Sequence, residues 1–100
     1  MFDSIEIEEL IKSKLDVKII DIRDNYQYNI GNIPGSINVP MNFILMNPNN
    51  YLDKKEKYYI YCEHGSRSTR VCSILTKAGY SVVNIIGGYN AYKLFVHKKS

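Results

Sequence analysis

Short β-forming runs alternate with helix-forming segments along this 100-residue chain, and the alternation restricts its possible folds more than any other feature. Three runs are rich in β-branched and aromatic residues: VKIID (17–21), KYYIYC (57–62) and SVVNII (81–86). The connections between strands and helices are short, which favours a parallel sheet covered by helices. The expected fold class is therefore α/β, a three-layer sandwich whose central, mainly parallel sheet is flanked by helices.

The helical segments are predicted from the spacing of apolar residues and from residues that end helices. We expect them at residues 7–12, 24–30, 41–46, 66–78 and 89–96. In the segment 66–78, Val71, Ile74 and Leu75 form an apolar stripe, and Gly79 ends the helix. NIPGSINVP (32–40) has two prolines and a glycine, so we expect an ordered loop with at most a tiny strand.

The composition is that of an ordinary globular protein, with 45% hydrophobic and 23% charged residues. No apolar run approaches the roughly 18 residues that cross a bilayer, so no membrane partner is expected. The first residues, MFDSIEIEEL, are acidic where a signal peptide needs a basic region, and we expect a cytoplasmic protein. No repeat or linker divides the sequence, so residues 1–100 are expected to form a single domain.

The charge pattern argues against a nucleic-acid-binding protein, and the cysteine content argues against a disulfide framework and a zinc site. The net charge of +3 comes from scattered lysines, and we interpret the cluster His97-Lys98-Lys99 as a frayed, solvated tail rather than a nucleic-acid site. Two cysteines do not make a disulfide framework. Together with the two histidines they lack the C-x-x-C or H-x₃-H spacing of a zinc site, so no metal is predicted.

The candidate chemistry lies in IYCEHGSRSTR (60–70). Cys62 ends the predicted central strand, and ligands of open α/β sheets bind beyond the carboxyl ends of the strands. A short loop then leads directly into a helix, so its N–H groups can converge on the point that the positive helix end also faces. Gly65 can supply the positive φ of such a loop, and Arg67 adds a fixed charge.

This loop leaves two interpretations of Cys62 open. A cup of amides stabilises a thiolate, the nucleophilic form, so Cys62 could carry a covalent anionic adduct. A buried, inert thiol beside a Ser-capped helix and a surface arginine fits the local sequence equally well. The spacing bears on the chemistry, because cysteine phosphatases generally place five residues between Cys and Arg. Here four intervene, and a smaller ring of amides suits a smaller passenger, such as one sulfur atom held as a persulfide.

Three motifs together resemble the single-domain rhodaneses, a sulfurtransferase family, over nearly the whole chain. Residues 62–67 (CEHGSR) are similar to the family's C-x-x-G-x-R loop, DIRDNYQYNIGNIPGSINVP (21–40) to D-x-R…E-Y…G-H-I-P-G-A-I-N-x-P, and AGYSVVNIIGGYNAY (78–92) to G-Y…L-x-G-G…W. The sequence departs from these patterns outside the loop, with Gln27 for Glu, Asn32 for His and Tyr92 for Trp.

The resemblance implies a rhodanese-like fold and a thiosulfate:cyanide type of sulfurtransferase that carries a sulfane sulfur as a persulfide on Cys62. Thiosulfate or a low-molecular-weight persulfide would donate the sulfur, and a thiol or cyanide would accept it. A sulfur-relay protein is a further candidate partner. The resemblance also implies that the backbone amides of Glu63, His64, Gly65, Ser66 and Arg67 hold the terminal sulfur of the persulfide. The Arg67 side chain would hold the loop and attract the anionic donor, and no metal or organic cofactor would be needed.

The resemblance assigns Asp21 and Arg23 to a supporting role in which they pair locally. Glu63 places a negative charge at an anion site, and we hypothesise that it weakens thiosulfate binding in favour of a thiol-persulfide or protein donor. Ser66 and Ser68 are expected to cap the helix, with Ser66 a candidate hydroxyl donor to sulfur, and Arg70 to be a surface residue. Cys72 is expected to be a buried thiol. A role as a resolving thiol is disfavoured, because its Cα should lie roughly 9 Å from that of Ser66 along the helix, whereas the Cα atoms of a disulfide lie within about 7 Å.

Two alternatives share the fold. The first is a non-catalytic rhodanese-like module that binds a partner, although such modules often lose the cysteine that this chain retains as Cys62. The second is a phosphatase or arsenate reductase, which the four-residue gap disfavours.

Overall fold

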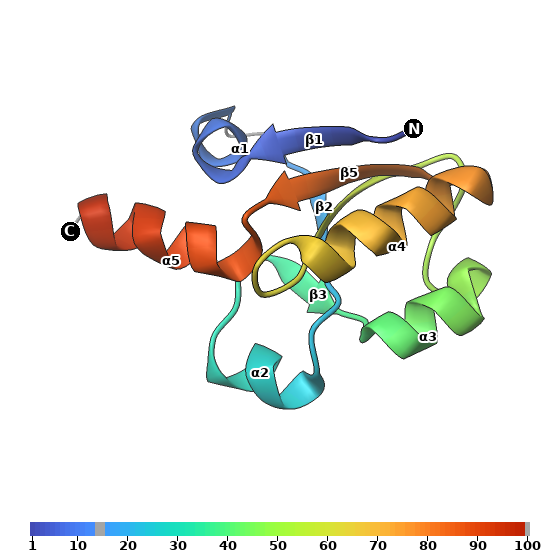
Figure 1. The fold of residues 1–100 in the computed structure, drawn as a ribbon, viewed down its shortest axis with the longest axis horizontal. Helices are drawn as coiled ribbons and strands as arrows, with labels where there is room; N and C mark the ends of the chain where they lie inside the picture. Colours follow the sequence, from blue (N-terminus) through green and yellow to red (C-terminus); the bar gives the residue numbers. More distant parts are fainter. Residues whose placement is uncertain (14–15, 100) are drawn as a thin grey trace.

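A computed structural model describes residues 1–13 and 16–99, and this part of the chain contains one sheet of five parallel strands (Figure 1). The strands are β1 (Asp3–Glu6), β2 (Lys18–Asp21), β3 (Ser36–Asn38), β4 (Lys57–Tyr61) and β5 (Ser81–Ile86). Their order across the sheet is β1-β5-β4-β2-β3, and each neighbouring pair runs parallel. The predicted α/β class and the central position of KYYIY are confirmed.

Helices cover both faces of the sheet. They are α1 (Ile7–Ser13), α2 (Asn25–Ile30), α3 (Met41–Met46), the short 3₁₀ helix η1 (Pro48–Asn50), α4 (Ser66–Lys77) and α5 (Gly88–Lys99). One buried cluster joins α3 and α4 to the sheet through Ile44, Val71 and Leu75. A second cluster joins α1 and α5 to the opposite face through Leu10 and Phe95. The three-layer arrangement follows from these two cores.

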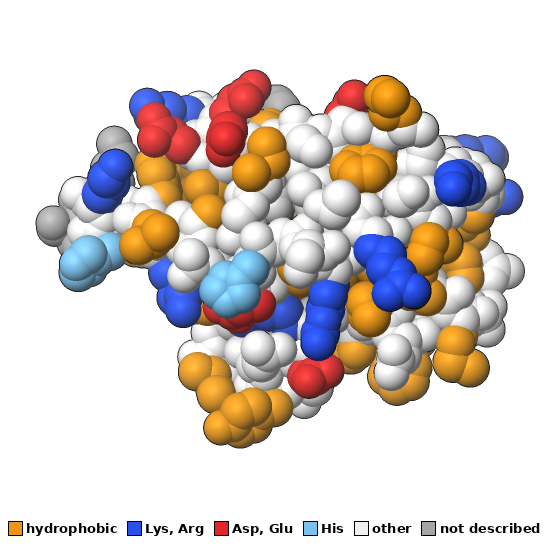
Figure 2. All heavy atoms as spheres, viewed as in Figure 1, with side chains coloured by type: hydrophobic (Ala, Val, Ile, Leu, Met, Phe, Trp, Pro, Cys, Tyr) orange, Lys and Arg blue, Asp and Glu red, His pale blue; other side chains and the backbone are white. Residues whose placement is uncertain are grey.

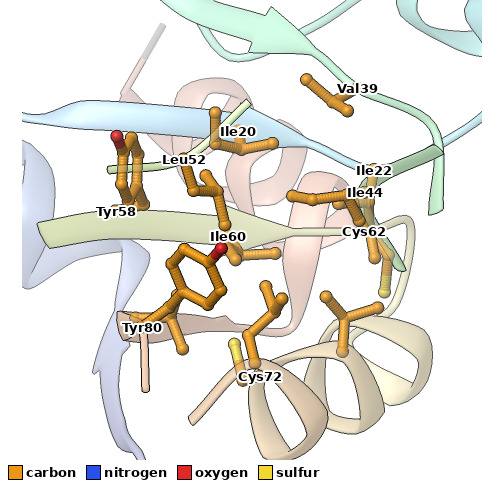
Figure 3. Packing of buried hydrophobic residues seen from close by; sticks show 13 residues of the cluster. Ile20, Ile22, Val39, Ile44, Leu52, Tyr58, Ile60, Cys62, Cys72 and Tyr80 are labelled. Carbon is orange, nitrogen blue, oxygen red and sulfur yellow. The ribbon is translucent and has the colours of Figure 1, made fainter. Parts of the chain in front are cut away.

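The central strand β4 divides its side chains between the two cores, because successive residues of a strand point to opposite faces. Tyr58, Ile60 and Cys62 belong to the core under α3 and α4, which Figure 3 shows around Ile60. Tyr61 belongs to the core under α1 and α5. The alternation therefore places the sulfur of Cys62 on the same side of the sheet as α4, the helix that follows it in the chain.

Two elements differ from the sequence-based expectation. Strand β1 was not predicted, since DSIE is mostly exposed and lacks an apolar run; it pairs with β5 at the edge of the sheet, from Asp3 opposite Val83 to Glu6 opposite Ile86. The basic C-terminal segment was expected to be frayed, but α5 continues through it to Lys99. His97 and Lys98 extend the helix as exposed residues.

None of the described helices has the length and apolar character of a bilayer-spanning segment.

Candidate active site

The candidate site is the turn between β4 and α4. Cys62 follows the last residue of β4, and three residues later Gly65 stands at the N-cap of α4. Gly65 has φ of 111°, a left-handed conformation that glycine adopts without steric cost. The chain therefore reverses within three residues, and the first turn of α4 returns over the end of β4.

The sulfur of Cys62 accepts hydrogen bonds from this turn. The backbone N–H of Gly65 lies 3.1 Å from Sγ and that of Ser68 lies 3.3 Å from it. The Cys62 residue is only 3% exposed. The sulfur thus lies in a nearly closed cup, next to two backbone N–H donors and the positive end of a twelve-residue helix.

The beginning of α5 fixes the orientation of the loop peptides. The N–H groups of Tyr89 and Asn90 donate to the carbonyl oxygens of Cys62 and Glu63, at 2.8 and 2.9 Å. In a trans peptide the C=O and the following N–H point in opposite directions, so the N–H groups of Glu63 and His64 face away from α5. Within residues 1–13 and 16–99, these two amides have no hydrogen-bond acceptor.

The Gly87-Gly88 turn permits this contact between α5 and the loop. A side chain on Gly88 would collide with the carbonyl oxygen of Cys62, and Gly88 also has a positive φ of 59°. A β-carbon on Gly65 would in turn lie 3.3 Å from the backbone nitrogen of Gly87. The two glycine turns pack so closely that a side chain on either would displace the cup.

Arg23 connects the loop after Cys62 to the rest of the fold. Its guanidinium donates to Asp21 (2.7 Å), to the carbonyl of Gly31 (2.6 Å) and to Glu63 (3.0 Å), and it lies over the ring of Tyr89 at 4.2 Å. Burial lowers the pKa of Arg23, but the hydrogen bonds and charge of Asp21, and then Glu63, outweigh it and raise that pKa above its usual value. Arg23 is therefore charged at any physiological pH.

Asp21 and Arg23 form the local pair that was expected, but the contact with Glu63 could not be anticipated, because forty residues separate the two partners. Glu63 also faces Lys93 of α5, whose Nζ lies 3.7 Å from Oε2. Its carboxylate is thus flanked by two cations, which offset its charge at the mouth of the site. The proposed repulsion of thiosulfate by Glu63 stays a prediction, and its expected size is reduced.

The serine hydroxyl that contacts the sulfur belongs to Ser68 and not to Ser66. Ser66 is exposed, whereas Ser68 is fully buried with Oγ 3.5 Å from Cys62 Sγ and 2.6 Å from Asn84 Oδ1. The expectation of a serine cap is wrong, since Gly65 occupies the N-cap without a side-chain bond. Asn84 was missed, although an amide inside the apolar run SVVNII was a visible signal.

Comparison with known proteins agrees with this geometry. The family model described as the rhodanese-like domain matches residues 5–94. The chain belongs to the rhodanese-like domain family. A protein of Allochromatium vinosum named sulfurtransferase is 32% identical over 91 residues, which are 90% of this chain and 84% of that protein.

Solved structures of similar chains support the assignment. A rhodanese-like domain protein from Staphylococcus aureus is 34% identical, with a TM-score of 0.83 over 91% of both chains. The protein SSP1007 from Staphylococcus saprophyticus is 38% identical, with a TM-score of 0.79 over 87% of this chain and 89% of that one. The rhodanese-like fold is therefore shown, and sulfur transfer is the activity of a named relative.

The cationic residues of this rhodanese-like domain at the start of α4 are exposed. The side chain of Arg67, in the first turn, has neither an ion pair nor a hydrogen bond with another residue of the described chain, and Arg70 is exposed one turn later. Figure 2 shows Lys and Arg side chains beside a histidine and an acidic group on this face. Arg67 does not brace the loop here, so its charge is available to an incoming anion.

Cys72 of the rhodanese-like domain is a buried thiol, as expected. It is fully enclosed in the core under α3 and α4 (Figure 3), and both cysteines are free. Burial first, and then the charge of Cys62, raise the pKa of Cys72 to about 12. Among the described residues no group of three His, Cys, Asp or Glu side chains could hold a metal ion.

Two of the three departures from the family pattern make contacts outside the loop after Cys62. Asn32, which replaces the usual His, donates from Nδ2 to the carbonyl of Tyr28 at 3.0 Å. The Tyr92 ring, which replaces Trp, stacks on Tyr89 with centroids 6.0 Å apart. The segment after Asn32 is held from β4, because the buried hydroxyl of Tyr61 accepts the N–H of Ile33 at 3.0 Å.

Proposed function

We propose that this rhodanese-like domain is a sulfurtransferase that carries a sulfane sulfur as a persulfide on Cys62. One observation carries the proposal: two amides donate to the Cys62 sulfur, and the amides of Glu63 and His64 beside it have no acceptor in the described chain. Unpaired amides around a nucleophile suit an anion that arrives with the substrate. In a persulfide that anion is the terminal sulfur.

The reaction proceeds in two halves. The Cys62 thiolate attacks the outer sulfur of thiosulfate, the S–S bond of the donor breaks, and sulfite leaves with the electron pair. The product is Cys62–S–S⁻, whose charge lies on the terminal sulfur. An acceptor thiolate or cyanide then attacks that sulfur, and the Cys62 thiolate leaves with the electron pair, which restores the enzyme and gives ping-pong kinetics.

The loop residues have separate roles in this scheme. The amides of residues 63–67 hold the terminal sulfur and disperse its charge, as preorganised donors do for a developing anion. Arg67 attracts the anionic donor from solution, and its exposure leaves it free to do so. Arg23 holds Glu63, and through it the loop, in the geometry that directs the amides inward.

The donor and acceptor are small or protruding groups, since Cys62 is almost completely buried. Thiosulfate and low-molecular-weight persulfides are donors of this kind, and cyanide or a thiol can serve as acceptor. A sulfur-relay protein could also act if it presents its sulfur at the end of a flexible segment. A phosphate ester is a poorer fit, because only four residues separate Cys62 from Arg67.

Intact mass spectrometry tests the proposal. The reduced protein is treated with thiosulfate or glutathione persulfide, desalted and weighed before and after addition of cyanide or a thiol. We expect a mass gain of one sulfur that the acceptor removes, that is absent in Cys62→Ser and that is retained in Cys72→Ala. No gain with either donor contradicts the proposal and favours a binding module, whereas hydrolysis of an aryl phosphate favours a phosphatase.

A further inference from the structure

Asn84 is a buried polar residue in the apolar strand β5. It lies between Val83 and Ile85, which are buried, and it is itself only 6% exposed. A buried amide is costly unless it is hydrogen-bonded. Its Oδ1 lies 2.6 Å from the hydroxyl of Ser68, the residue that also contacts the candidate nucleophile. Asn84 therefore stands two hydrogen bonds away from the Cys62 sulfur.

The hydroxyl of Ser68 has one proton and several neighbours that compete for it. Asn84 Oδ1 lies 2.6 Å from Ser68 Oγ, the carbonyl of Gly65 lies 3.1 Å away, and Cys62 Sγ lies 3.5 Å away. The shortest contact is with Asn84, so the proton points to the amide oxygen. A lone pair of Ser68 Oγ then faces the sulfur, and the Cys62 thiol donates its proton to it.

We propose that Asn84 is a positioning residue that acts through Ser68 to keep the proton on the resting Cys62 thiol. By accepting the Ser68 proton, Asn84 makes Ser68 Oγ an acceptor that stabilises the thiol. A thiolate on Sγ would face the same lone pair and be disfavoured. In the persulfide, on the proposed function, the charge moves to the terminal sulfur and away from Ser68. The Asn84–Ser68 hydrogen bond therefore favours the persulfide anion over the thiolate of unloaded Cys62.

Other charged and titratable groups around Cys62 influence its ionisation, and the substitutions below leave them unchanged. The loop contributes Glu63 and His64, and α4 contributes Arg67, Arg70 and Cys72. Asp21 at the end of β2 and Arg23 just after it form a further pair, and α5 contributes Lys93. His64 lies in the same loop, two residues after Cys62. Repeating the measurement in a His64→Asn background separates its contribution from that of Asn84.

The test is the pH dependence of Cys62 alkylation by iodoacetamide, which needs no sulfur donor. Trypsin cleaves after Arg67 and Arg70, so Cys62 and Cys72 fall on different peptides and are quantified separately by mass spectrometry. In Asn84→Val the Ser68 hydroxyl loses its nearest acceptor, and its proton is then shared between the Gly65 carbonyl at 3.1 Å and the Cys62 sulfur at 3.5 Å. The midpoint of the profile should shift to lower pH, with about three- to tenfold faster alkylation below it, the range that one hydrogen bond supplies.

Ser68→Ala determines the sign of the effect. If Ser68 Oγ accepts the thiol proton, its removal destabilises the thiol and also shifts the profile to lower pH. If Ser68 instead donates to the thiolate, the profile shifts to higher pH and the proposal is wrong. In the Ser68→Ala background, Asn84→Val should add nothing, because its effect passes through the missing hydroxyl.

A purely structural role of Asn84 gives a different pattern. Ile85→Val, which alters packing on the other face of β5, should leave the alkylation profile unchanged. An unchanged profile in Asn84→Val, or the same shift with and without Ser68, overturns the inference. Should Asn84→Val fail to fold, the sign of the Ser68→Ala shift still decides. If the inference about Asn84 is wrong, the proposed sulfur loading of Cys62 is not affected, because loading is measured independently by intact mass spectrometry.

Discussion

Replacing Arg23 by methionine should destabilise the protein more than the loss of any exposed ion pair. Asp21 is fully buried and lies 2.7 Å from the Arg23 guanidinium. Removing one partner of such a pair leaves an uncompensated buried charge, which costs about 3–5 kcal/mol. The same substitution removes the bonds to Glu63 and to the Gly31 carbonyl. We therefore expect a loss at the upper end of that range.

Urea denaturation followed by circular dichroism measures this loss as a change in the free energy of unfolding. The matched control is Lys12→Met, which breaks the exposed Lys12–Glu8 pair of α1 and should cost less than about 0.5 kcal/mol. Adding Asp21→Asn to Arg23→Met should recover part of the stability, because the stranded charge is removed. A loss below about 1 kcal/mol in Arg23→Met refutes the view that the buried pair anchors the loop.

Four further predictions follow from the site. Glu63→Gln should change the KM for thiosulfate by less than about twofold, since flanking cations offset the charge; a tenfold fall instead shows that repulsion dominates. Arg67→Gln should raise that KM about three- to tenfold at low salt, with the difference shrinking at high salt; an unchanged KM contradicts its role in attracting the donor. Gly88→Ala should slow sulfur loading, whereas Gly35→Ala, with open space at its β-carbon, should not; equal rates in the two variants count against the packed cup. Burial raises the pKa of the Cys72 thiol from 9.0 to about 12. The neutral buried thiol therefore makes its full contribution to the stability of the fold below pH 9, and this contribution is lost as the pH rises toward 12. Urea titrations should then show a shallower alkaline decline in Cys72→Ala, and parallel declines contradict the burial effect.

The sheet and its central strand could be predicted because they depend on local pattern. KYYIYC alternates between two cores, and each face of β4 needs apolar residues at every second position. Strand β1 could not be predicted in the same way. Its residues DSIE are mostly exposed, and the strand is defined by pairing with β5 eighty residues away.

The candidate site was predictable to a similar degree. Cys62, Gly65 and the helix start are adjacent in sequence, so their geometry follows from a short strand–loop–helix connection. The contacts that hold the loop come from distant elements: Arg23 from the end of β2, and Asn84 from β5. Which of two nearby serines reaches the sulfur depends on the exact start of α4, a detail that residue type alone does not determine.

The location of the sulfur after one loading reaction without acceptor tests most directly whether Cys62 carries it. The protein is incubated with excess thiosulfate or glutathione persulfide, desalted, blocked with iodoacetamide and digested with trypsin, which separates Cys62 from Cys72. We predict one additional sulfur per chain, confined to the Cys62 peptide and removed by cyanide before blocking. Sulfur on the Cys72 peptide, or no added sulfur with either donor, contradicts the assignment of Cys62 as the sulfur carrier.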